Sequence, residues 1–342
     1  MKTQIRPIPG RPHSGKSVML WMFLCGLIAL VSSAHAQVVN SLQNPLQIAV
    51  LHWYPANQTT SFDIANNPQG LAFDGENIWM VDTTDEHVYA LRASDGALVA
   101  DLDIYPVQLA PWGIAFDGTH TWVTDSAYAQ GIVTRLDGAS FFVGPCPTGV
   151  AFDGANVWIV NSGCTSQDPV TVTKLRASDG ANLGGFFVAG VGSGGNPLGL
   201  AFDGANIWVP SGTAPGFVVK LRAGDGANLG NFPVGNAPRS VAFDGANIWV
   251  GNQADNTVTK LRASDGAFVG TFALSGAPLS LVFDGANIWV TNGSGNIDKL
   301  RASDGTNVDT FFVGSFARGA TAMVFDGAHV WASHVVSLVS KF

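Results

Sequence analysis

A polar residue follows each of seven regularly spaced tryptophans in this chain. Three residues after each tryptophan the sequence has Asp82, Asp125, Asn161, Ser211, Asn252, Asn292 and His334. Carboxylate oxygens and imidazole nitrogens bind divalent cations, and a carboxylate also pairs with a histidine base. Asp82, Asp125 and His334 are therefore candidates for a metal site or for acid–base catalysis, with a divalent cation as the possible cofactor. The alternative is that these residues start a loop and bond its backbone, as in Asx turns.

A second position varies freely in residue type while its neighbours stay constant. It lies four residues before each repeated phenylalanine, at Gln69, Trp112, Thr148, Leu198, Arg239, Leu279 and Thr321. Trp112 falls outside the regular tryptophan spacing, and Tyr105 lies shortly before it. An aromatic ring together with a guanidinium can grip a sugar, a carboxylate or a peptide. The ligand-binding candidates are Trp112, Arg239, Gln69, Tyr105 and, from the first set, Asn292; the alternative is a loop position with no role.

Both positions belong to a repeat. Phe-Asp-Gly, with Trp six residues after the Phe, occurs seven times, starting at Phe73, Phe116, Phe152, Phe202, Phe243, Phe283 and Phe325. The steps between successive Phe residues are 43, 36, 50, 41, 40 and 42. A period near 40 with glycine-bounded apolar segments is typical of β-propeller blades.

The unit at residues 238–278 shows the expected strands most clearly. Strand A covers residues 240–243, strand B 247–251, strand C 257–261 and strand D 268–272, with Asp-Gly turns between A and B and between C and D. Four antiparallel strands joined in this way form one blade. The sequence therefore predicts an all-β, seven-bladed β-propeller. The repeated Phe and Trp side chains are expected to pack between blades, because each can bury about 150–250 Å².

The ends of the repeat predict how the ring closes. The last copy stops at Lys341-Phe342, the end of its strand C, and so has no strand D. Residues 61–64, Ser-Phe-Asp-Ile, resemble a strand D and have no blade of their own. We expect this N-terminal strand to complete the last blade, which removes open sheet edges. The pairing of residues 42–54 stays open.

The N-terminal residues are typical of an export signal. Residues 1–36 contain a basic stretch, an uncharged apolar run and Ala34-His35-Ala36, which together predict a cleavable signal peptide. The remaining assignment is an extension at residues 37–60 and the propeller at residues 61–342. We expect a periplasmic or extracellular protein with no membrane span after cleavage; the alternative is a retained anchor. The net charge of −8 and the lack of a basic run argue against nucleic-acid binding.

Two cysteines remain outside the signal segment. Cys146 lies in the D–A loop that enters the third blade, and Cys164 lies in the B–C loop of that blade. Both loops emerge at the same end of one blade, and export leads to an oxidising compartment. We therefore expect a disulfide; the alternative is two free thiols.

These units resemble the secreted and periplasmic β-propeller repeats of the YVTN, NHL and virginiamycin B lyase-like group. The resemblance covers roughly residues 61–342 and rests on Pro-x-Gly, Phe-Asp-Gly, Trp-Val-Thr-Asn and Ser-Asp-Gly. It implies the propeller fold, which hosts binding modules, lyases, hydrolases and structural repeats. The lyase has glutamates at the ends of several B strands and a catalytic histidine, whereas this sequence has mostly Asn at those strand ends. The resemblance therefore does not imply lyase activity.

Function in such a fold is expected on the variable loops. We expect an exported monomer that acts as a ligand-binding or protein-interaction scaffold through the central funnel on the face with the B–C and D–A loops. Its partner would be a small molecule, a glycan or a protein. One alternative is a metal-assisted lyase or hydrolase that uses Asp82, Asp125 and His334. A second alternative is a cell-surface structural repeat.

Overall fold

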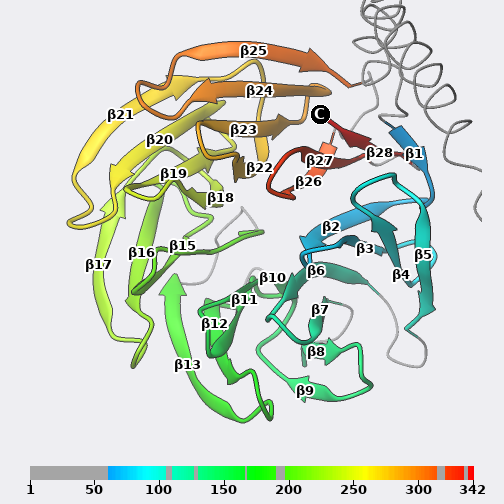
Figure 1. Ribbon diagram of the computed structural model, residues 1–342. Coiled ribbons are helices and arrows are strands. Elements are labelled where there is room, and N and C mark those ends of the chain that lie inside the picture. Colours follow the sequence, from blue (N-terminus) through cyan, green and yellow to red (C-terminus); the bar gives the residue numbers. More distant parts are fainter. Residues whose placement is uncertain are drawn as a thin grey trace, which may run out of the picture. The chain divides into compact units, whose positions relative to one another are not determined.

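Seven four-stranded antiparallel sheets make up the described part of the chain and surround a common axis (Figure 1). The computed structural model describes residues 61–104, 110–126, 130–165, 168–189, 197–313, 320–334 and 338–342. Thr60–Phe342 form one compact unit. The predicted seven-bladed β-propeller is confirmed. In the described ranges we find no helix with the length and apolar character that crossing a membrane requires.

Each blade runs from an inner to an outer strand. Blade 1 has β2 (Pro68–Phe73), β3 (Asn77–Asp82), β4 (His87–Arg92) and β5 (Leu98–Asp103). Blade 2 has β6 (Pro111–Phe116), β7 (Thr121–Asp125), β8 (Ile132–Arg135) and β9 (Ser140–Phe142). Blade 3 has β10 (Pro147–Phe152), β11 (Asn156–Asn161), β12 (Val170–Arg176) and β13 (Asn182–Ala189).

The remaining blades follow the same order. Blade 4 has β14 (Ala201–Phe202), β15 (Asn206–Pro210), β16 (Phe217–Arg222) and β17 (Asn228–Pro233). Blade 5 has β18 (Pro238–Phe243), β19 (Asn247–Asn252), β20 (Thr257–Arg262) and β21 (Phe268–Ala273). Blade 6 has β22 (Pro278–Phe283), β23 (Asn287–Asn292), β24 (Asn296–Arg301) and β25 (Asn307–Phe312). Blade 7 has β26 (Ala320–Phe325), β27 (Val330–His334), β28 (Leu338–Lys341) and, as its outer strand, β1 (Ser61–Asp63).

The Asp of the repeat motif bonds both the turn and the tryptophan of its blade. In blade 5, Asp244 Oδ1 accepts the backbone N–H groups of Ala246 (2.9 Å) and Asn247 (2.6 Å). Its Oδ2 accepts the indole N–H of Trp249 at 2.8 Å. The same indole–carboxylate bond occurs in all seven blades. Gly245 then adopts φ 95°, which a residue with a Cβ rarely takes. The turn and the buried tryptophan are therefore tied together.

The repeat tryptophans form the core between blades, as predicted. Six of the seven are buried, and Trp79 is half-buried. Trp249 packs on Phe272 of the outer strand, with ring centroids 5.4 Å apart. The Lys260 ammonium lies 4.8 Å from the Trp249 ring and donates to Ala302 O of the next blade at 2.6 Å. A lysine or arginine covers the tryptophan in six blades, and Ala90 takes that position in blade 1.

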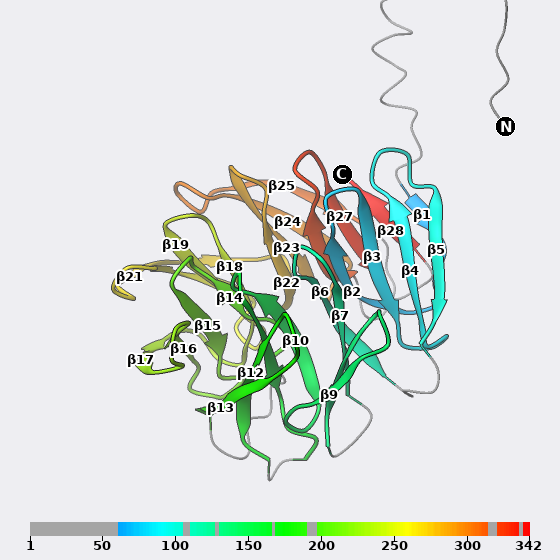
Figure 2. The ribbon, with the colours of Figure 1, turned by 60° about the horizontal axis from the view of Figure 1, so that its bottom comes forward.

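Ring closure occurs as the sequence predicts. Both ribbon views show β1 beside β28 (Figures 1 and 2), and Phe62 lies opposite Val339 in that pairing. The Phe62 ring stacks on Trp331 at 5.5 Å, so it replaces the outer-strand Phe of the other blades. Lys341 of blade 7 donates to Ala93 O of blade 1 at 2.8 Å. The assignments at residues 1–36 and 37–60, including the pairing of residues 42–54, lie outside the described residues.

A disulfide joins Cys146 and Cys164, as predicted, with the two Cα atoms 5.2 Å apart. The Cys146 carbonyl also accepts bonds from the backbone N–H and the hydroxyl of Ser162, each at 3.0 Å. The covalent bond and these hydrogen bonds hold the loop before β10 against the loop after β11. This end of blade 3 is therefore cross-linked on the face where the inner strands begin.

Candidate functional site

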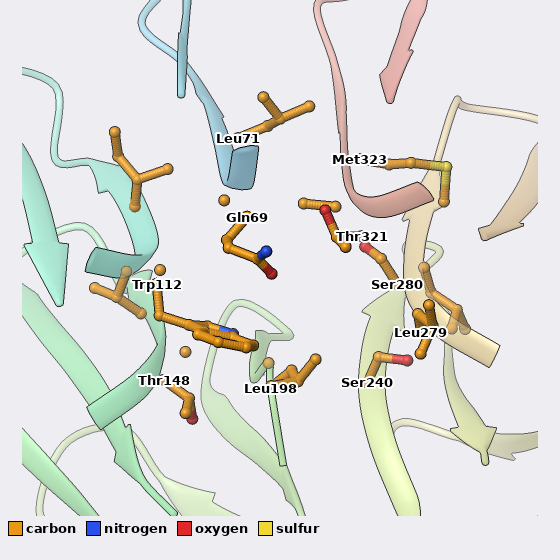
Figure 3. A pocket seen from close by; sticks show the side chains of 18 of the residues that line it. Gln69, Leu71, Trp112, Thr148, Leu198, Ser240, Leu279, Ser280, Thr321 and Met323 are labelled. Carbon is orange, nitrogen blue, oxygen red and sulfur yellow. The ribbon is translucent and has the colours of Figure 1, made fainter. Parts of the chain in front are cut away.

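The inner strands of all seven blades surround a central cavity of about 190 Å³. The cavity lies where these strands begin, on the face with the D–A and B–C loops. Six of the seven residues at the variable second position line it: Gln69, Trp112, Thr148, Leu198, Leu279 and Thr321. The residues that differ most between repeats therefore meet in one place (Figure 3).

Glycine after the variable residue lets neighbouring inner strands approach closely. A Cβ added to Gly70 would lie 2.5 Å from the Trp112 carbonyl oxygen, and one added to Gly149 would lie 2.6 Å from the Leu198 carbonyl oxygen. This contact explains why the Pro-x-Gly motif has glycine at residues 70 and 149. Sequence reasoning singled out only the variable residue, yet the next position also lines the cavity. Its departures from Gly, to Ser240, Ser280 and Ala322, were the available signal.

Trp112 differs from the seven repeat tryptophans in position and in bonding. It is half-buried at the start of β6, and its ring extends into the cavity (Figure 3). Each repeat tryptophan donates its indole N–H to an aspartate, but the N–H of Trp112 has no acceptor among the described residues. Trp112 therefore presents both an aromatic ring and a hydrogen-bond donor to the cavity.

Polar side chains from three other blades surround this ring. The Gln69 amide also projects into the cavity (Figure 3), and its Nε2 donates to Asn67 Oδ1 at 2.7 Å. Thr148 donates to Pro197 O at 2.7 Å, and Thr321 donates to Pro68 O at 2.8 Å, so each hydroxyl ties its blade to the next. Both hydroxyl oxygens remain able to accept a bond. None of the described residues that line the cavity is charged.

None of the first set of candidates is among the residues that line the cavity. Each of these residues except Ser211 pairs with the residue that starts its inner strand, as Asp82 does with Pro68. Asp82 is fully buried and accepts the backbone N–H groups of Asn67, Thr84 and Asp85 at 2.6, 2.7 and 2.9 Å. The Asx-turn interpretation therefore describes Asp82.

The structure does not assemble the metal site suggested by Asp82, Asp125 and His334. Among the described residues, which include all three, no group of three His, Cys, Asp or Glu side chains is placed to hold a metal ion. His334 is 3% exposed, and its Nε2 lies 2.9 Å from Ser340 Oγ. Burial lowers the pKa of His334 to about 4, so its imidazole is neutral at pH 7. The side chains of Asp82 and His334 bond within their own blades, and Asp125 is buried at the end of β7.

Two other candidates, Asn292 and Arg239, are not among the residues that line the cavity. Asn292 is buried and donates to Ser275 Oγ (2.8 Å) and to Asp298 Oδ2 (2.9 Å) of its own blade. Arg239 is half-buried, and burial lowers the pKa of its guanidinium. Its Nε is buried without a partner among the described residues. Tyr105 lies outside the described residues.

Comparison with solved structures identifies the same architecture. A streptogramin B lyase structure superimposes with a TM-score of 0.66 at 14% identity, covering 81% of this chain and 93% of that one. Virginiamycin B lyase from Staphylococcus aureus superimposes with a TM-score of 0.68 at 13% identity, covering 82% of this chain and 97% of that one. This chain has the fold of these lyase propellers. The resemblance inferred from the motifs is confirmed at the level of the fold. No family model matches the chain, and no curated protein matches it.

Proposed function

We propose that this protein is an exported binding module that takes up a small uncharged ligand at the mouth of its central channel. The observation that carries the proposal is that the variable positions of an otherwise regular repeat surround one cavity. A rigid frame with variable residues at one site is the usual arrangement of a binding scaffold. The export-type N-terminal sequence and the Cys146–Cys164 disulfide support a location outside the cytoplasm.

The chemistry of the lining favours binding over catalysis. The described residues around the cavity include no Asp, Glu, His, Cys, Lys or Arg. Acid–base catalysis needs a titratable group within hydrogen-bond reach of the substrate. The hydroxyls of Thr148 and Thr321 donate to backbone carbonyls, so neither is paired with a base that would activate it. The cavity supplies shape and hydrogen bonds rather than reactive groups.

A thermal-shift screen of uncharged small molecules tests the proposal. A ligand that binds only the folded state raises the melting temperature according to its concentration and its Kd. We expect compounds that stabilise the wild-type protein and fail to stabilise Trp112→Ala. Phe312→Ala is the matched control, because Phe312 is an aromatic residue on outer strand β25 with 69% exposure. Compounds that stabilise the wild type and Trp112→Ala equally would contradict a site in the channel.

A further inference from the structure

We infer that the channel ligand is a neutral saccharide whose terminal ring sits against Trp112; this inference rests on the proposed function. The absence of charge around the cavity is the first reason. Moving an ionised ligand out of water into a site without a counter-charge is strongly unfavourable. The described lining residues offer no such charge, and Arg239 is not one of them. Carboxylate and phosphate ligands are therefore disfavoured.

Trp112 gives the second reason. Its ring extends across the cavity, where a flat ligand face can lie against it (Figure 3). The face of an aromatic ring carries partial negative charge and attracts groups with partial positive charge. The C–H groups on one face of a pyranose are such groups, because each carbon bears an electronegative oxygen. The unpaired indole N–H can at the same time donate to a hydroxyl at the edge of the sugar ring.

The remaining polar groups match a ligand with many hydroxyls. Gln69 uses one amide N–H on Asn67, and its carbonyl oxygen has no partner among the described residues. Thr148 and Thr321 each keep acceptor capacity. A purely apolar ligand would leave the Gln69 carbonyl oxygen and the Trp112 indole N–H without partners, which is costly. A hydroxyl both donates and accepts, so a sugar can satisfy every one of them.

The cavity also has the right size for one sugar ring. Pockets for drug-sized ligands have volumes of roughly 300–1,000 Å³, whereas this cavity has about 190 Å³. One ring fits within such a volume, and further rings of a glycan would extend out of the open mouth. The cavity would therefore bind one sugar ring, either the terminal residue of a glycan or a free monosaccharide.

Binding of defined sugars to the full mature chain tests this inference. The probes are the methyl glycosides of glucose, galactose and N-acetylglucosamine, with methyl glucuronide as the carboxylate-bearing match to glucose and benzamide as a neutral ligand that is not a sugar. Saturation-transfer NMR and calorimetry are the readouts. We expect at least one neutral glycoside to bind, with its ring C–H protons most strongly saturated. Trp112→Ala should abolish binding, and Trp112→Phe should retain part of it.

Two further variants define the site. Gln69→Leu keeps the shape of the side chain but loses its hydrogen bonds, so we expect affinity to fall about tenfold. Phe312→Ala should bind like the wild type. Tighter binding of the glucuronide than of the glucoside, or equal losses in Phe312→Ala and Trp112→Ala, would overturn the inference. Trp112-dependent binding of benzamide without binding of any sugar would overturn the saccharide class and leave the proposed function standing. If neither this set nor the uncharged screen gives binding that depends on Trp112, the saccharide inference and the proposed function are both overturned.

Discussion

Trp112 and the seven repeat tryptophans carry the same indole group but differ in its hydrogen bonding. A repeat tryptophan has an aspartate five residues before it, and that carboxylate holds its N–H, as Asp244 does for Trp249. Val107 stands at this position before Trp112. The local sequence therefore distinguishes the two classes: each repeat tryptophan has an acceptor for its indole N–H five residues earlier, and Trp112 does not.

The aspartates of the repeat motif make the fold sensitive to strong acid. Burial alone would raise the pKa of Asp244, but bonds from Trp249, Ala246 and Asn247 outweigh it and lower the pKa below 3.8. The other six repeat aspartates shift in the same direction. A lowered carboxyl pKa stabilises the folded state above pH 3.8, and that stabilisation is lost as the pH falls through the folded-state pKa.

His334 makes the stability of the fold depend on pH in a milder range. Its pKa is about 4 in the folded state, against an ordinary value of 6.5. Between these pH values the unfolded chain binds a proton that the folded chain excludes, so stability falls as the pH falls from 6.5 to 4. We expect His334→Asn to remove this loss, which is at most about 3 kcal/mol. Urea unfolding at pH 7, 5.5 and 4.5 measures it.

The Asn variant is a conservative choice for this test. Three blades already have Asn at this position, and Asn252 donates to Thr259 at 2.8 Å, where blade 7 has Ser340. Hydrogen bonding to Asp101 raises the pKa of His87, which stabilises the protein at low pH, but His87 is unchanged in both proteins. Parallel stability profiles of the wild type and His334→Asn between pH 6.5 and 4 would contradict the prediction.

At the scale of elements, the inner strand of blade 4 departs from the pattern of the other blades. β14 of blade 4 is only two residues long, whereas the other inner strands have six. Pro210 on the adjacent strand has no N–H to donate, and Gly251 holds that position in blade 5. In blade 4, only Ala201 and Phe202 of the inner strand pair with β15.

Two glycines at the same repeat position should respond differently to substitution. A Cβ on Gly113 would collide with the Thr148 carbonyl oxygen, whereas a Cβ on Gly199 meets nothing within 4 Å. We expect Gly113→Ala to lower the free energy of unfolding by about 1–3 kcal/mol, because the backbone must shift. Gly199→Ala should change it by no more than about 1 kcal/mol. Guanidinium unfolding of both variants provides the comparison, and equal losses would disprove the close-approach explanation.

At the scale of the whole molecule, the ring depends on a three-residue strand. Phe62 of β1 replaces the outer-strand phenylalanine of blade 7, and it also packs on Gly96 of blade 1. Phe232 makes the equivalent contacts between blades 4 and 5, with Trp208 and Gly266. The difference is that β17 continues directly from β16, whereas β1 joins blade 7 from the other end of the sequence.

Removing Phe62 should therefore open one blade specifically. We expect both Phe62→Ala and Phe232→Ala to destabilise the protein by roughly 2–4 kcal/mol through lost packing. Only Phe62→Ala should free β1 and expose the edge of β28, which speeds hydrogen exchange at Val339 and Ser340. Hydrogen-exchange mass spectrometry reports this difference. Unchanged exchange in β28 of Phe62→Ala would show that the closing strand is held by other contacts.

The sequence by itself determined the blades, their number, the closing strand and the disulfide. Strand alternation and Asp-Gly turns are local rules, and seven copies of one unit leave little freedom in how they stack. The closure by residues 61–63 followed from a missing strand at one end and a spare strand at the other. The Cys146–Cys164 pair followed from two loops at one end of a single blade.

Only the tertiary structure decided which side chains share a site. Asp82, Asp125 and His334 have the right chemistry for a metal, yet the structure does not bring them together, and Asp82 and His334 bond within their own blades. Gln69, Trp112 and Thr321 do line the cavity. Each of them directly follows the inner-strand residue that pairs with Asp82, Asp125 or His334. The strand ladder is irregular at this point: the register shifts after Pro68, and the consecutive residues Gln69, Gly70 and Leu71 all line the cavity. Repeat spacing gives the position of a residue in its blade, and the closed ring decides which of these positions meet.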